Sequence, residues 1–134
     1  MAELGTVYPK ETLSARRVAE GLNLSVKYLE QIMSALKASG LIRSVRGVNG
    51  GYALARPPGE ITLYDIFRVL EGAPLFLDCL RTPEECPRES ICATRDVWKE
   101  MNDALTAILR RTTVADLVER SSRKRQTQAK MYHI

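Results

Sequence analysis

The chain has 134 residues and a formal net charge of +4, and 45% of its residues are hydrophobic and 27% charged. This length and composition predict one globular domain with a modest core, and they exclude a disordered or fibrous protein. No apolar run approaches the roughly 18 residues of a membrane span, and the first residues lack the apolar segment of a signal peptide, so we expect a cytoplasmic protein with no membrane partner.

The charges are unevenly distributed along the chain. Residues 1–56 carry eight Lys and Arg against four Asp and Glu, whereas residues 57–120 carry eight against twelve. Residues 121–134 carry four basic residues and no acid, and we expect them to form a basic flexible tail. A basic first half is typical of a surface that meets a polyanion, although an uneven set of solvated side chains gives the same sum.

Two helices joined by a short turn are predicted over residues 14–40. Ser14 and Ser25 are suitable N-caps, because a serine hydroxyl accepts hydrogen bonds from the N–H groups of a first helical turn. The segment GLNL between the helices interrupts the apolar pattern, and Gly40 ends the second helix. In that helix the apolar residues recur at helical spacing: Val26, Leu29, Ile32, Met33 and Leu36. This order is typical of a helix-turn-helix motif.

A β-hairpin is predicted directly after these helices. Two strand-like runs, Leu41–Val45 and Tyr52–Ala55, flank the segment RGVNGG, in which Asn49 and Gly50 predict the turn because both tolerate positive φ. The arginines of this region are Arg43, Arg46 and Arg56, and no acid occurs from residue 38 to residue 59. An arginine on a glycine-rich hairpin tip can enter a DNA minor groove, so we favour a wing over a solvated hairpin.

Three further helices are predicted. A capping box, Thr62-x-x-Asp65, begins one helix, and Thr113-x-x-Asp116 begins a last short one. Between them residues 94–111 form a long amphipathic helix, whose apolar stripe is Val97, Met101, Ala104 and Ile108. This spacing suits a partner helix. Because so small a monomer has little core to cover the stripe, we favour a dimer interface over packing within one chain.

All three cysteines, Cys79, Cys86 and Cys92, fall within fourteen residues. Buried thiols would be scattered over apolar faces, and disulfides are disfavoured by the odd count. Structural zinc usually needs close Cys pairs and four ligands, whereas the gaps here are six and five residues and the sole histidine, His133, lies in the tail. An iron–sulfur cluster held by three thiolates would be labile, which suits a sensor. Spacing alone leaves a metal or cluster and a thiol redox switch equally open.

Taken together, these stretches resemble one family. The segment LSVKYLEQIMSALKASGLIRSVRGVNGGYALARPPGEITLYDI, the three-cysteine loop, VWKEMNDAL and TTVADL are similar to the winged-helix iron–sulfur regulators of the Rrf-two family over roughly residues 2–120. The resemblance implies a mainly α fold with a small β-hairpin wing, in which a winged helix-turn-helix is joined to a long dimerisation helix. It implies a homodimeric transcriptional regulator that binds double-stranded DNA and carries a [2Fe-2S] or [4Fe-4S] cluster.

The resemblance also implies the organisation and the site residues. Residues 1–72 would be the DNA-binding region, 73–93 the sensor loop, 94–120 the dimerisation helix with a short C-terminal helix, and 121–134 the tail. The expected DNA contacts are Ser25, Lys27, Tyr28, Glu30 and Gln31 on the recognition helix and Arg43, Arg46 and Gly47 on the wing. The expected cluster ligands are Cys79, Cys86 and Cys92. Gain, loss or nitrosylation of the cluster would reorder the loop and move the two recognition helices of the dimer.

The sequence departs from the family pattern at three points. The wing reads RGVNGG where relatives usually have RGPGGG, and Arg95 stands where some members have a histidine. The start MAELG resembles only the second half of a longer first helix, so we expect the native start to lie upstream of Met1. The fourth cluster ligand is therefore unassigned, with Glu84, Glu85, Glu89, Asp96 and an external thiol as candidates.

Three rival functions remain from the sequence. A thiol-based regulator without a cluster is one, and a protein-interaction module of cysteine or iron–sulfur metabolism is another. An enzyme is disfavoured, because no histidine lies near the cysteines and the sequence contains no phosphate-binding glycine loop.

Overall fold

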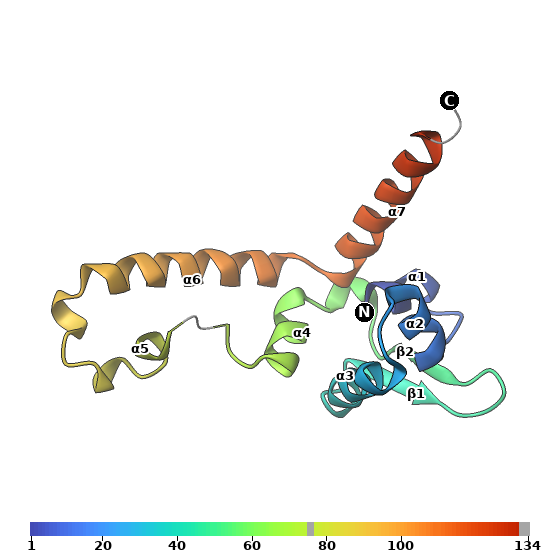
Figure 1. Ribbon diagram of the computed structural model, residues 1–134, viewed down its shortest axis with the longest axis horizontal. Coiled ribbons are helices and arrows are strands. Elements are labelled where there is room, and N and C mark those ends of the chain that lie inside the picture. The colour runs from blue at the N-terminus through green and yellow to red at the C-terminus, as the bar shows by residue number, and fades with distance from the viewer. Residues whose placement is uncertain (75–76, 132–134) are drawn as a thin grey trace.

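The computed structural model describes residues 1–74 and 77–131 (Figure 1). The fold is mainly helical with one antiparallel pair of strands, which confirms the expected class. The helices are α1 (Ala2–Val7), α2 (Ala15–Leu22), α3 (Val26–Ala38), α4 (Leu63–Leu70), α5 (Asp78–Arg81), α6 (Ala93–Arg111) and α7 (Val114–Met131), and the strands are β1 (Ile42–Val45) and β2 (Gly51–Leu54). Within the described ranges, no helix has both the length and the apolar character needed to cross a membrane.

The first part of the chain forms a compact head around one core. Both predicted caps are present, since the Ser14 and Ser25 hydroxyls accept hydrogen bonds from the N–H groups of Arg17 and Tyr28, each at 3.2 Å. Helix α3 buries one face, formed by Leu29, Met33 and Leu36, and packs against α2, α4 and β1. These residues share a core with side chains from α1, the hairpin, the segment before α4 and the start of α7, including Leu4, Leu54, Ile61 and Val114.

The hairpin forms where it is predicted, but its turn differs in conformation. Strands β1 and β2 pair from Ile42 opposite Leu54 to Val45 opposite Gly51. Positive φ occurs at Gly47 (+115°) and Gly51 (+155°) rather than at Asn49 and Gly50, and the Gly50 N–H donates to the Gly47 carbonyl at 2.9 Å. Gly50 is needed for space instead, because a Cβ there would lie 2.5 Å from the Val45 carbonyl oxygen.

A junction of two capping boxes joins the head to the C-terminal helices. Thr62 with Asp65 begins α4 and Thr113 with Asp116 begins α7, as the sequence predicts. The two threonines also face each other in a β-bridge, where the Leu63 N–H donates to the Thr112 carbonyl at 2.8 Å. Hydrogen bonds from the N–H and hydroxyl of Thr113 hold the pKa of Asp116 below its ordinary value.

Helices α6 and α7 leave this junction in different directions (Figure 1). The first half of α7 packs against α1 so closely that a Cβ at Gly5 would lie 2.7 Å from a Val118 methyl group. The Arg125 guanidinium forms an ion pair with Glu3 at 2.9 Å.

The last helix is longer than expected, since residues 114–131 are helical and most of the predicted tail belongs to α7. The segment SSRKRQTQAKM contains no Gly or Pro, and an Arg123–Glu119 pair one turn apart supports the helix. The remaining residues 132–134, with His133, lie outside the described part of the chain.

The cysteine segment contains short helical turns, which the two prolines did not predict. Helix α5 is followed by the 3-10 turns η2 (Pro83–Glu85) and η3 (Glu89–Ile91). Pro83 begins η2, where the missing proline N–H removes no helical hydrogen bond. The segment runs beside α6, and α5 contacts that helix (Figure 1).

Candidate functional site

The recognition helix of the expected motif is α3, and its first two turns present polar side chains to solvent. Residues Ser25, Lys27, Tyr28, Glu30 and Gln31 are all exposed, on the side opposite the buried face of α3. Tyr28 is 53% exposed, so it does not serve as a core aromatic. An exposed row of hydroxyl, ammonium, carboxylate and amide groups on one helix face can form hydrogen bonds with phosphates and base edges.

The wing adds cationic side chains beside this helix. Arg43, Arg46 and Gly47 are exposed, and Val48 in the wing turn is fully exposed. No ion pair within residues 1–74 and 77–131 involves Lys27, Arg43 or Arg46. Their charges are therefore not neutralised by a neighbouring carboxylate, and α3 packs directly against β1. The predicted DNA-binding residues thus lie on one rigid unit, and their contacts with DNA stay a prediction.

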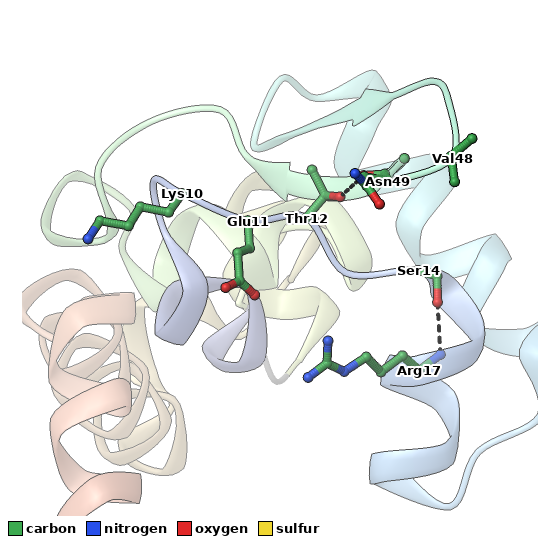
Figure 2. A pocket seen from close by; sticks show the side chains of 8 residues that line it. Lys10, Glu11, Thr12, Ser14, Arg17, Val48 and Asn49 are labelled. Carbon is green, nitrogen blue, oxygen red and sulfur yellow. Dashed lines mark hydrogen bonds between the residues drawn. The ribbon is translucent and has the colours of Figure 1, made fainter.

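A cavity of about 540 Å³ lies between residues 10–14, the start of α2 and the wing turn, and Figure 2 shows the side chains that line it. The Thr12 hydroxyl donates a hydrogen bond to the Asn49 carbonyl at 2.7 Å. Next to it, Leu13 and Tyr52 exchange two backbone hydrogen bonds, at 3.0 and 2.8 Å, so residue 13 extends the sheet. Sequence reasoning missed this contact, because Thr12 and Asn49 are 37 residues apart and no local pattern relates them.

The three cysteines are half-buried free thiols, but they do not converge on one point. Cys79 and Cys86 line a cavity of about 310 Å³ together with Glu85, whereas Cys92 is the N-cap residue of α6 and does not line it. No three His, Cys, Asp or Glu side chains of the described residues form a group that could hold a metal ion. In this arrangement the predicted ligands do not fit a cluster.

Two of the other candidate ligands near the cysteines, Glu85 and Glu89, have partners of their own. The Glu85 carboxylate accepts a hydrogen bond from the Thr82 hydroxyl at 3.0 Å. Glu89 forms an ion pair with Arg95 at 3.1 Å, and the Arg95 Nε is buried without a hydrogen-bond partner. The residue that replaces the family histidine therefore supports the segment as a cation and cannot serve as a metal ligand.

Helix α6 exposes the apolar stripe that the sequence predicts. Val97, Met101 and Ile108 are 55%, 49% and 46% exposed, and Ala104 between them is also exposed. The opposite side packs toward α4 and buries Leu109 and Asn102, whose side-chain oxygen has no hydrogen-bond partner. The two helices are also joined by Arg110, whose guanidinium lies 3.9 Å from the centre of the Tyr64 ring. A stripe of this length on the solvent side of α6 can pack against another apolar surface.

Comparison with known proteins gives consistent matches. Residues 1–120 match the family described as "Rrf2: Iron-dependent Transcriptional regulator". The chain is 39% identical to the HTH-type transcriptional regulator CymR of Bacillus subtilis, over 87% of this chain and 80% of that protein. It is 34% identical to Protein rrf2 of Nitratidesulfovibrio vulgaris, over 84% of this chain and 75% of that protein.

Solved structures give the same result for the fold. The structure of CymR, described as the global cysteine regulator of B. subtilis, superposes with a TM-score of 0.77 and 36% identity, covering 88% of this chain and 86% of that one. The structure of T. potens IscR superposes with a TM-score of 0.73 and 33% identity, covering 90% of this chain and 78% of that one.

Proposed function

Because the chain belongs to the Rrf2 family of transcriptional regulators, we propose that it binds double-stranded DNA through α3 and the wing, and that its cysteine segment adjusts this binding. Its relatives are regulators and not enzymes. The observation that carries the proposal is that α3 and the hairpin pack against each other and both expose polar or basic side chains, among them Lys27, Gln31 and Arg46, with no ion pair to Lys27 or Arg46 in the described residues. A DNA-binding regulator acts where the chromosome lies, which in bacteria is the cytoplasm.

The proposed assembly is a homodimer formed through α6. The exposed stripe of Val97, Met101, Ala104 and Ile108 would pack against the same stripe of a second copy. A two-fold dimer presents two recognition helices, which read half-sites about one helical turn, roughly 34 Å, apart. Because this spacing must match the duplex, a small change in the angle between the two heads would change affinity strongly.

The sensing chemistry has two candidates. A labile [2Fe-2S] or [4Fe-4S] cluster is supported by three thiols within fourteen residues, by the iron-dependent description of the family and by the similarity to IscR. Thiol chemistry without a cluster is supported by the cavity that Cys79 and Cys86 share and by the similarity to a cysteine regulator. Because no three donors of the described residues are gathered, we favour thiol chemistry.

DNA binding is tested with two variants on the same face of α3. We expect Lys27→Ala to weaken binding to all duplexes alike, because an ammonium contacts phosphates, and Gln31→Ala to relax sequence preference, because an amide reads base edges. The operator would first be selected from a random duplex pool, and affinities would then be measured on it and on a scrambled duplex. Equal losses on both duplexes for both variants would contradict this division of roles.

A second experiment distinguishes the iron–sulfur cluster, the thiol switch and the protein-interaction module from one another. Protein purified without oxygen would be examined by visible absorbance, with iron and sulfide counted. A coloured protein with stoichiometric iron and sulfide would establish the cluster, and a colourless one whose DNA affinity changes on oxidation would establish the thiol switch. A weak DNA affinity that is unchanged by Arg46→Ala would instead favour a protein-interaction module.

A further inference from the structure

We propose that the cavity between residues 10–14, the start of α2 and the wing turn holds one backbone phosphate of the bound duplex, contacted by Arg17 and Lys10. This inference rests on the proposed DNA binding and adds to it. The site lies outside α3. If the inference holds, the segment between α1 and α2 contacts the DNA directly.

The position of the cavity favours a contact with the sugar-phosphate backbone of DNA rather than with its bases. One wall of the cavity is the wing turn itself, residues 48–50. A minor groove is only about 6 Å wide, so a wing tip inside it is flanked on both sides by phosphates. When the tip occupies the groove, a cavity lined by that tip therefore faces the backbone on one side.

The two walls of the cavity are held at a fixed separation. The Thr12 hydroxyl donates to the Asn49 carbonyl at 2.7 Å, and Leu13 is hydrogen-bonded to Tyr52 in both directions. The backbones approach so closely that a Cβ at Gly51 would lie 2.6 Å from the Leu13 carbonyl oxygen. A preformed site loses little conformational entropy when a phosphate enters it.

The side chain of Arg17 is suited to bind this phosphate because its charge is not neutralised. It is exposed and extends into the space below the wing turn (Figure 2), where the Ser14 hydroxyl already accepts from its backbone N–H. On its other side a neighbouring cavity contains the acids Glu3 and Glu20. These acids are paired with Arg125 and Arg16, each at 2.9 Å, and Arg17 has no ion pair within the described residues.

The remaining charged groups of the cavity are Lys10 and Glu11. Lys10 is exposed, and Figure 2 shows its side chain pointing away from Arg17, so it has to turn to reach a phosphate bound there. The Glu11 carboxylate opposes an anion, and Figure 2 shows it pointing away from the wing turn into the space that Arg17 also enters. With two cations and one carboxylate, the lining keeps a net charge of +1. We therefore expect Glu11→Gln to tighten DNA binding.

The test measures affinity for the selected operator against salt concentration. The slope of log K against log salt changes by about one unit for each neutralised phosphate, so the double variant Arg17→Ala with Lys10→Ala should lower it by about one. Each single variant should lower the slope by part of that amount. Affinity should fall roughly tenfold, equally on the operator and on a scrambled duplex. Arg17→Lys should keep the slope. Arg16→Ala is the matched control, because Arg16 is the adjacent cation of α2 and is already paired with Glu20.

The contact can be located with a series of duplexes, in each of which a different phosphate is replaced by a neutral methylphosphonate. One substitution beside the minor groove should weaken binding of the natural protein and have no effect on the Arg17→Ala variant. If Arg17→Ala and Lys10→Ala keep the natural slope while Arg46→Ala and Lys27→Ala lower it, the phosphate site is wrong and the proposed function stands. If none of the four changes the slope, the proposed function fails as well. Saturable binding of inorganic phosphate without DNA would assign the site to a free anion and would also overturn the inference.

Discussion

The DNA-binding head and the cysteine segment differ in what holds them in place. Of the fourteen buried hydrophobic residues in the described part of the chain, twelve precede α4, so the head has a core of its own. Between residues 77 and 92, by contrast, no described side chain is buried, and the segment contacts the rest of the chain mainly through α6. Segments with few buried contacts open at low free-energy cost. The proposed DNA-binding part is therefore held by its own core, while the part that carries the thiols can change conformation without unfolding the head.

The largest expected effect comes from removing a core side chain of the head. Leu54→Ala, at a residue only 1% exposed, should lower the free energy of unfolding by about 2–5 kcal/mol. Ile91→Ala in the cysteine segment, where the side chain is 74% exposed, should change it by less than about 0.5 kcal/mol. Urea unfolding of both variants at one protein concentration makes the comparison. Similar losses would contradict the distinction between the two regions.

A substitution on the outer face of α6 is expected to have an intermediate effect, which is on the stability of the dimer. Met101→Lys places a charge in the proposed contact between two copies, where it would have to lose water without gaining a partner. We expect the dimer to weaken by about 2–3 kcal/mol, or roughly a hundredfold in Kd, as measured by sedimentation. Glu100→Lys adds a positive charge at a neighbouring exposed position and is the control. A dimer that tolerates Met101→Lys would place the contact elsewhere.

The smallest effect is expected at the junction between head and α6. Thr113→Ala removes the cap of α7 and its hydrogen bonds with Asp116, and should cost about 1 kcal/mol of unfolding free energy. Thr62→Ala removes the equivalent cap of α4 and should cost a similar amount. Hydrogen exchange adds detail, because α7 should lose protection in the first variant and α4 in the second. Uniform loss over the whole head in both variants would show that the junction opens as one unit.

The features that sequence predicted well depend on contacts within a few residues. The serine caps of α2 and α3 and both capping boxes each join residues only three positions apart, so their patterns are visible locally. The exposure of Val97 and Met101 followed from helical spacing, because an amphipathic stripe specifies its own face.

The features that sequence missed depend on distant or competing contacts. The Thr12–Asn49 hydrogen bond joins segments far apart in the chain, and the close packing of Gly50 against Val45 decided the turn conformation over the preference of Asn49 for positive φ. The length of α7 was underestimated. The polar, basic composition of residues 121–131 was taken to indicate a solvated tail, although the segment contains good helix formers.

The β-bridge between Thr62 and Thr113 has a mechanical consequence. The bridge and the packing of α6 against α4 hold the C-terminal part of α6 close to the head, so a tilt of α6 would displace mainly its N-terminal end. Helix α6 has 19 residues and is therefore about 28 Å long, so a tilt of about 5° displaces its free end by roughly 2 Å. Cys92 lies at this N-terminal end of α6, so in the proposed mechanism a small rearrangement there would change the angle between the helix and the head.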